Sequence, residues 1–320
     1  MKFSVRRLGL RASAALVLGL VGLLLAVAGA GVGFALGSGF GGFGGNATPP
    51  PSGPRLLQVK IDNQEIFNDR YSQTAEVKAG ATTFAVKTAT NPGYTVLLVR
   101  MPDGVAISDY IDGLSKISNG GTEDPKEAAK YDQVNWGGAR IDADCPVSFT
   151  VVLEPGIYYL LAFRGAGVSD PNPKAQKVVV TGTVTDTELP QTDGEILISD
   201  SASGPRFTAP DHWPAEGTFL VRNEATYANE AVFLPLKPEA NDGTLKQFFV
   251  DSPKPNWSKA PITTLRVCGL APMSPGRQAV VHFNSPPGPY VLTSFTFNRA
   301  ANKRQYQLGM YQRLTLSSNP

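Results

Sequence analysis

Histidine and cysteine are scarce in this chain. Among 320 residues there are two of each, and charged residues make up only 18%. Two histidines, His212 and His282, exclude any enzyme class that needs several imidazole ligands. No G-x-S-x-G motif occurs, so the nucleophile turn of α/β-hydrolases is also absent. These absences favour a binding or structural protein over an enzyme.

The N-terminal 54 residues contain no acidic side chain. Four basic residues precede an uncharged apolar run over 12–36, which is long enough to cross a bilayer as a helix. A cleaved signal peptide usually has a shorter apolar region, although small-residue sites within the run leave cleavage open. We therefore expect a cytoplasmic segment over 1–11, a signal anchor over 12–36, and export of the remainder to the periplasm or the cell surface.

A linker over 37–54 is rich in Gly and Pro, which predicts a stalk between the membrane and the exported part. Beyond it, basic and acidic residues nearly cancel, so nothing predicts binding to nucleic acid. Two cysteines in an exported chain, Cys145 and Cys268, allow one disulfide. Two separate buried thiols are the alternative, because the pair does not occupy equivalent places in the repeat described next.

The exported part repeats one pattern of strands. "TTFAVKT" from Thr82 matches "GTFLVRN" from Gly217, and "EPGIYYLLAF" matches "PPGPYVLTSF" later in each copy. A short helical pattern lies between, near Ile107 in one copy and Gly243 in the other. Short β-branched runs bounded by Gly, Pro, Asn and Asp predict antiparallel strands. We expect an all-β protein with one β-sandwich over 55–185 and a second over 190–318.

One predicted strand is apolar on both sides. Tyr159, Leu161 and Phe163 alternate with Tyr158, Leu160 and Ala162. Such a strand belongs at the centre of a sheet, where the core covers one face and a helix or a second domain covers the other.

The second half resembles the cupredoxin-like domains of bacterial exported proteins. The resemblance rests on "WPAEGTFLVRN", "PGPYVLTSF" and "LGMYQRLTL". It implies two tandem Greek-key sandwiches, and in the copper-binding members of the family it implies a type 1 copper site that carries electrons. Such a site needs two imidazoles, one thiolate and a weak axial sulfur.

The copper positions that the resemblance implies are degenerate here. The two histidine positions fall at Asn229 and Gln305, the thiolate position falls at Ser294, and only Met310 is kept. In the first half the thiolate position is Ala162, and that half contains no histidine. The sequence therefore predicts no metal, no other cofactor and no catalytic residues.

The irregular segments between the short helix and the later strands carry Trp136 and Trp257, one in each copy. Long loops on a rigid sandwich often bind partners, so both tryptophans are candidate partner-binding residues. Packing against the end of each sandwich is the alternative. Asp142 and Asp144 form a carboxylate pair, but the spacing of a calcium loop is missing.

The function expected from the sequence is a membrane-anchored, extracytoplasmic, non-catalytic binding, scaffold or accessory subunit. Its partners are expected to be the membrane, through the N-terminal helix, and other membrane or envelope proteins. Two alternatives stay open: an electron-transfer protein or enzyme with an unrecognised site, and a module that binds a small molecule or a glycan.

Overall fold

A computed structural model describes residues 54–318, apart from 63–64, 69–73, 119–130, 132, 166–172, 253 and 264–266. The predicted cytoplasmic segment, signal anchor and most of the linker lie outside the described residues. Within the described part of the chain, no helix is both long and apolar enough to cross a bilayer. The described residues belong to one compact unit.

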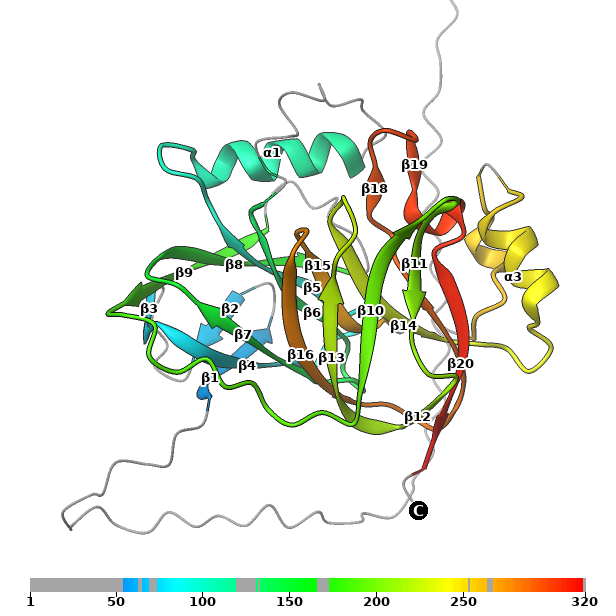
Figure 1. Ribbon diagram of the computed structural model, residues 1–320, viewed down its shortest axis with the longest axis horizontal. Helices are drawn as coiled ribbons and strands as arrows, with labels where there is room; N and C mark the ends of the chain where they lie inside the picture. The colour runs from blue at the N-terminus through cyan, green and yellow to red at the C-terminus, as the bar shows by residue number, and fades with distance from the viewer. Residues whose placement is uncertain are drawn as a thin grey trace, which may run out of the picture. The chain divides into compact units, whose positions relative to one another are not determined.

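The chain is mostly β-structure, built from two large sheets (Figure 1). The first sheet has eight strands, in the spatial order β11 (Gly204–Thr208), β10 (Gly194–Ser201), β13 (Glu216–Asn223), β16 (Arg277–Asn284), β7 (Val147–Leu153), β4 (Gly80–Thr88), β1 (Arg55–Asp62) and β2 (Glu65–Asn68).

The second sheet has ten strands, in the spatial order β12 (His212–Pro214), β20 (Tyr311–Ser317), β17 (Gly288–Thr293), β14 (Asn229–Pro235), β15 (Cys268–Met273), β6 (Asn135–Ile141), β5 (Tyr94–Arg100), β8 (Gly156–Arg164), β9 (Lys174–Thr181) and β3 (Thr74–Lys78). A separate small hairpin joins β18 (Phe297–Asn298) to β19 (Lys303–Arg304).

Both sheets run from one half of the sequence into the other. In the eight-stranded sheet, β16 pairs antiparallel with β7, and in the ten-stranded sheet β15 pairs antiparallel with β6. On either side of each central pair, the strands of one half follow in the same order as the strands of the other half. The parallel pair β1–β4 corresponds to β10–β13, and β3–β9 corresponds to β12–β20. The division into two separate sandwiches stays a prediction, because these ladders join the halves directly.

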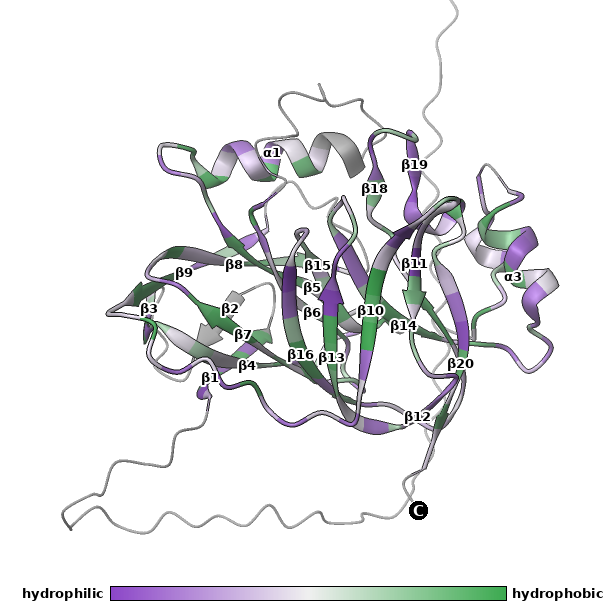
Figure 2. Cartoon of the chain, in the orientation of Figure 1, coloured by the Kyte–Doolittle hydropathy of each residue, from purple (hydrophilic) through white to green (hydrophobic). Residues whose placement is uncertain are grey.

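A continuous hydrophobic core lies between the sheets. It receives Phe84 and Phe149 from one sheet and Tyr158 and Leu160 from the other, and all four side chains are buried. Figure 2 shows hydrophobic stretches along the strands that supply this core. Their burial supplies the main stabilising term, because apolar area removed from water is worth about 25 cal/mol per Å².

The outer face of the ten-stranded sheet carries two smaller apolar clusters, and a helix covers each of them. Helix α1 (Ile107–Ser118) contributes Tyr110 to the first cluster, which also contains Leu161 and Phe163 of β8. Since Tyr158, Leu160 and Ala162 of the same strand belong to the central core, the prediction of a strand covered on both faces is confirmed. Helix α3 (Asp242–Phe249) covers the second cluster and contributes Leu245 and Phe249.

Helix α3 begins with a reciprocal cap. Asn241 Oδ1 accepts a hydrogen bond from Thr244 N at 3.0 Å, and Thr244 Oγ1 accepts one from Asn241 N at 2.9 Å. Asn241→Ala is expected to lower the free energy of unfolding by about 1 kcal/mol, because an orphan N–H at the helix start loses its acceptor. Asn241→Asp keeps the acceptor and serves as the control. Urea unfolding of the three proteins measures the effect, and equal stability of wild type and alanine variant would contradict it.

Candidate functional site

The four degenerate copper positions lie together at one end of the second half. Asn229 begins β14, Ser294 directly follows β17, and Met310 directly precedes β20. Gln305 begins the short 3-10 helix η2 (Gln305–Leu308). All four residues are fully buried. The β14–β17 and β17–β20 pairings therefore gather residues that are up to 81 positions apart in the sequence.

Hydrogen bonds connect these positions. Ser294 Oγ donates to Asn229 Oδ1 at 3.5 Å and also lies 2.9 Å from Thr296 Oγ1. The backbone N of Gln305 donates to Thr296 O at 2.9 Å, and the backbone N of Met310 donates to Gln305 O at 3.1 Å. The side chain of Asn229 also donates to Tyr227 O at 2.9 Å. A polar network therefore links the places where copper ligands are expected from the resemblance.

The donor set at these positions does not fit a type 1 copper site. It offers two amides, one hydroxyl and one thioether, whereas copper of this type needs imidazole and thiolate. Neither side-chain atom of the Gln305 amide has a hydrogen-bond partner, although both are buried. In the first half, Ala162 at the corresponding thiolate position is a buried apolar residue. Nowhere in the described ranges do three or more His, Cys, Asp or Glu side chains gather as a candidate metal site.

A buried ion pair lies beside this network and joins the two halves. Arg140 of β6 donates to Glu230 Oε2 from Nη2 at 2.6 Å and from Nε at 3.0 Å. The other carboxylate oxygen of Glu230 accepts from Phe295 N at 2.8 Å, and Arg140 Nη1 also donates to Thr95 Oγ1. The side chains are 5% and 0% exposed. The sequence signal for this pair is a single charged residue in each of two otherwise uncharged strands, "NWGGARI" and "NEAVFLP".

Trp257 packs in an aromatic cluster on the outer side of the second half. It lies on the 3-10 helix η1 (Trp257–Lys259), partly exposed, with ring centroids 5.0 Å from Phe248 and 5.6 Å from Phe295. Tyr306 joins the same cluster at 6.2 Å from Trp257, and burial raises the pKa of its hydroxyl. The indole thus covers hydrophobic surface while part of it stays open to solvent.

The placement expected for Trp136 on a loop needs correction. Trp136 lies within strand β6, is 5% exposed and belongs to the central core. Its ring meets the Tyr158 ring edge-on at 5.2 Å. The composition around Trp136 conceals a strand, because "NWGGARI" contains two glycines, which weaken strand propensity. The segment nevertheless pairs with both β5 and β15. Trp136 is therefore a core residue of a strand, rather than part of a partner-binding loop or a plug at the end of a sandwich.

The two histidines lie on different sheets. His282 of β16 is partly buried, and its Nδ1 lies 3.1 Å from Thr218 Oγ1 of the neighbouring strand β13. His212 begins β12 and is exposed. A single imidazole bonded to a threonine hydroxyl is typical of a strand side chain and offers no catalytic pair.

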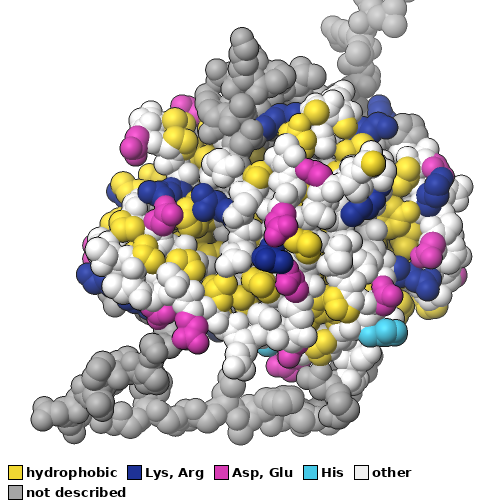
Figure 3. Space-filling model, viewed as in Figure 1, with side chains coloured by type: hydrophobic (Ala, Val, Ile, Leu, Met, Phe, Trp, Pro, Cys, Tyr) yellow, Lys and Arg dark blue, Asp and Glu magenta, His cyan; other side chains and the backbone are white. Residues whose placement is uncertain are grey.

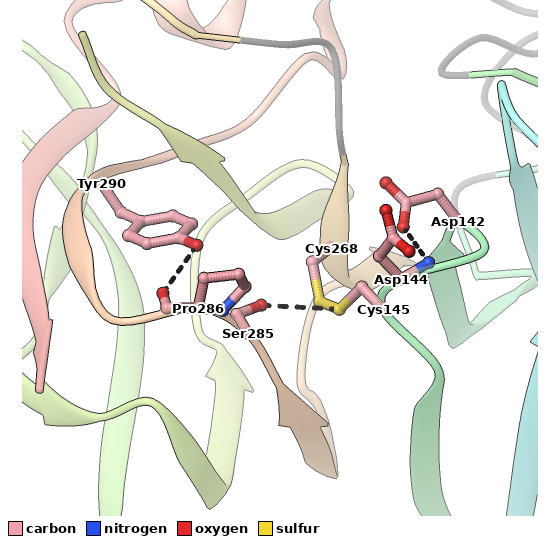
Figure 4. The surroundings of a disulfide bond; sticks show 7 residues. All are labelled: Asp142, Asp144, Cys145, Cys268, Ser285, Pro286 and Tyr290. Atoms are coloured by element: carbon pink, nitrogen blue, oxygen red, sulfur yellow. Dashed lines mark hydrogen bonds between the residues drawn. A yellow bond between two sulfur atoms is a disulfide. The ribbon is translucent and has the colours of Figure 1, made fainter. Parts of the chain in front are cut away.

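Cys145 and Cys268 form a disulfide that also joins the two halves (Figure 4). Cys268 begins β15, whereas Cys145 lies in the turn between β6 and β7. Ser285 Oγ donates to Cys145 Sγ at 3.5 Å. Both sulfur-bearing residues are buried, so the bond lies within the packed protein.

Asp142 and Asp144, in the same turn, lie in different environments. Asp144 N donates to Asp142 Oδ1 at 2.9 Å, which closes a local turn, and Asp142 is buried while Asp144 is exposed (Figure 4). On the face of the protein seen in Figure 3, Lys and Arg side chains are interspersed with Asp and Glu. No field of one sign covers that face.

No family model matches the chain, and no curated protein matches it in sequence. Among solved structures, reduced auracyanin from the photosynthetic bacterium Roseiflexus castenholzii is 13% identical with a TM-score of 0.24, covering 39% of this chain and 95% of its own. Auracyanin B is 15% identical with a TM-score of 0.25, covering 41% and 93%.

A larger copper protein is similar over more of the chain. The copper-containing nitrite reductase from Thermus scotoductus is 10% identical with a TM-score of 0.22 and covers 82% of this chain and 61% of its own. Likenesses with TM-scores this low carry no argument about this protein.

Proposed function

We propose that this chain is a membrane-anchored, extracytoplasmic subunit that binds or holds other envelope proteins and catalyses no reaction. In this proposal residues 55–185 and 190–318 are two tandem cupredoxin-like halves without copper. The observation that supports it best is the hydrogen bond from Ser294 Oγ to Asn229 Oδ1, at the positions where a thiolate and an imidazole are expected. The corresponding strand order of the two halves supports the tandem arrangement.

The test uses full-length protein extracted from membranes in mild detergent. Metal analysis and a visible absorption spectrum are expected to show no stoichiometric transition metal. Crosslinking before extraction is expected to capture a reproducible envelope partner. A stoichiometric metal with a visible absorption band would favour the electron-transfer alternative instead. A chain that stays monomeric and without a partner under crosslinking would contradict the scaffold role.

Restoring the copper ligands tests the proposed relation to cupredoxins. The triple variant Asn229→His, Ser294→Cys, Gln305→His is expected to bind one Cu²⁺ per chain and to become intensely coloured. The reason is that these positions and Met310 are buried together, and imidazole, thiolate and thioether are the ligands that such copper requires. Copper titration followed by absorption spectroscopy measures the effect.

The matched control for this variant keeps Ser294. Without a thiolate, the double variant Asn229→His, Gln305→His is expected to lack the intense colour. Circular dichroism shows whether the triple variant is folded. A folded triple variant that binds no copper would contradict the proposed correspondence between these residues and the copper ligands of cupredoxins. It would leave the scaffold role, which the crosslinking experiment tests, untouched.

A further inference from the structure

An arginine of the second half lies over the ring of a tryptophan of the first half. Arg277 Cζ lies 3.6 Å from the centroid of the Trp136 ring. The position follows from the turn between β15 and β16, where Gly276 adopts a φ of +73° and donates from N to Asn223 O at 2.7 Å. A positive φ favours glycine, and it lets the chain reverse directly before Arg277. A guanidinium stacked on an indole is attracted by the ring face and held in a fixed orientation.

The stacked pair has hydrogen-bond donors and almost no acceptors. Arg277 Nε and Trp136 Nε1 are both buried, and neither has a hydrogen-bond partner. The only hydrogen bond described for the Arg277 guanidinium is a long one, from Nη2 to Gln133 O at 3.5 Å. Among the described residues, no carboxylate lies within ion-pair distance of Arg277. A buried donor without an acceptor costs about 1–3 kcal/mol. These two donor atoms have no exposed surface, so a ligand from solvent would meet the guanidinium at its Nη atoms, since Arg277 as a whole is only partly buried.

Neighbouring charges do not supply that acceptor. Arg100 is the second guanidinium of the cluster and lies 5.7 Å from the Tyr158 ring, which itself contacts Trp136. Glu154 is the carboxylate of the cluster, and its Oε2 is bound to Arg100 Nη1 at 2.5 Å. Tyr158 Oη donates to Glu154 O at 3.1 Å. Two guanidinium groups therefore share one carboxylate that is already paired.

The electrostatics agree with the geometry. Burial lowers the pKa of Arg277 from its ordinary value, and this effect outweighs the influence of Tyr158 and Glu154, which raise it. Burial also raises the pKa of Tyr158 to about 12, so this hydroxyl stays neutral and adds no negative charge at physiological pH. An anion placed against Arg277 would offset the cost of holding its charge partly out of water.

We propose that Arg277, stacked on Trp136, is a binding site for a carboxylate, supplied by a free small molecule or by an acidic side chain of a bound protein. A carboxylate has two acceptor oxygens at the spacing of two guanidinium N–H groups, which makes such pairs strong and specific in geometry. This inference goes beyond the proposed scaffold role, because the site would exist whether or not the chain holds other envelope proteins.

The experiment measures the thermal unfolding temperature of the full-length protein in detergent during titration with sodium acetate and with inorganic phosphate. Sodium chloride at equal ionic strength is the reference, since it screens charge without offering a carboxylate. A capped peptide with one central glutamate, compared with its glutamine twin, tests the side-chain source. If acetate raises the unfolding temperature, the site takes the carboxylate of a free small molecule. If only the glutamate peptide raises it, the site takes an acidic side chain of a bound protein.

Three variants make the result decisive. Arg277→Met keeps an unbranched apolar side chain over Trp136 but removes the donors, and it is expected to weaken binding about tenfold or more. Arg277→Lys keeps the charge but loses the planar fork, and it is expected to bind with intermediate affinity. Arg222→Met is the matched control, because Arg222 on the adjacent strand is half exposed and already paired with Glu195 at 2.6 Å. It is expected to bind like wild type.

Several outcomes would overturn the site. One is that acetate and the glutamate peptide raise the unfolding temperature of wild type no more than chloride does. Another is that Arg277→Met responds as wild type does. A third is that phosphate raises the unfolding temperature while no carboxylate does. If Arg277→Met does not fold, the lysine variant decides: wild-type affinity in Arg277→Lys would also contradict a bidentate carboxylate site.

Discussion

Glu230→Gln is expected to lower the free energy of unfolding by about 3 to 5 kcal/mol. The substitution keeps the shape of the side chain and an acceptor for Phe295 N, but it removes the negative charge that faces Arg140. Arg140 would then hold a buried positive charge without a counter-charge. Leaving such a charge uncompensated costs far more than losing a surface pair, because water cannot replace the missing partner.

Equilibrium urea unfolding measures this loss, with Glu195→Gln as control. Glu195 pairs with Arg222 at 2.6 Å, and both side chains are 40% exposed. The control is therefore expected to lose less than about 1 kcal/mol. The double variant Arg140→Met, Glu230→Leu removes both charges and is expected to lose much less stability than the single variants Arg140→Met and Glu230→Leu lose together. A loss of under about 1 kcal/mol in Glu230→Gln would show that the pair is not buried in solution.

Removing the disulfide is expected to cost roughly 2 to 5 kcal/mol. Cys145 and Cys268 are 123 positions apart, and chain-entropy reasoning gives about 5 kcal/mol for a loop of this length. The bond restricts the unfolded chain, and in the folded protein it holds the turn before β7 to the start of β15. The variant Cys145→Ala, Cys268→Ala removes the crosslink while adding no buried polar group.

Urea unfolding of the oxidised wild type and the double alanine variant measures this effect. Wild type unfolded and kept reduced is expected to match the variant, since both lack the crosslink. Mass spectrometry after thiol alkylation shows whether the bond is present at the start. Free thiols in protein isolated from the envelope, or equal stability of wild type and variant, would contradict the prediction.

The sequence predicted the elements well because each carries its own local pattern. Alternating apolar residues and bounding turn residues predicted the strands of both halves, and the short helices near Ile107 and Gly243 are α1 and α3. Apolar residues on both sides of β8 predicted its central place. The resemblance predicted degenerate copper positions at four residues, and that correspondence stays a prediction. The structure places the four residues, Asn229, Ser294, Gln305 and Met310, together.

What the sequence could not predict depends on pairing between distant segments. The ladders β16–β7 and β15–β6 use backbone groups, which leave no signature in residue type. The loop predicted around Trp136 was wrong for the same reason, because β6 is held on both edges despite its two glycines. Arg140 and Glu230 lie 90 positions apart, and only their strands' pairing and packing show that they meet.

The two central ladders decide how the halves can move. A hinge between them would have to break β16–β7 and β15–β6 together, along with the disulfide and the Arg140–Glu230 pair. The segment that connects the halves is bound to strand β4, since Ala81 N donates a hydrogen bond to Asp186 O at 2.7 Å. A partner of the kind proposed above would meet the two halves at fixed spacing, and contacts that engage both halves would not have to overcome the entropy of aligning them.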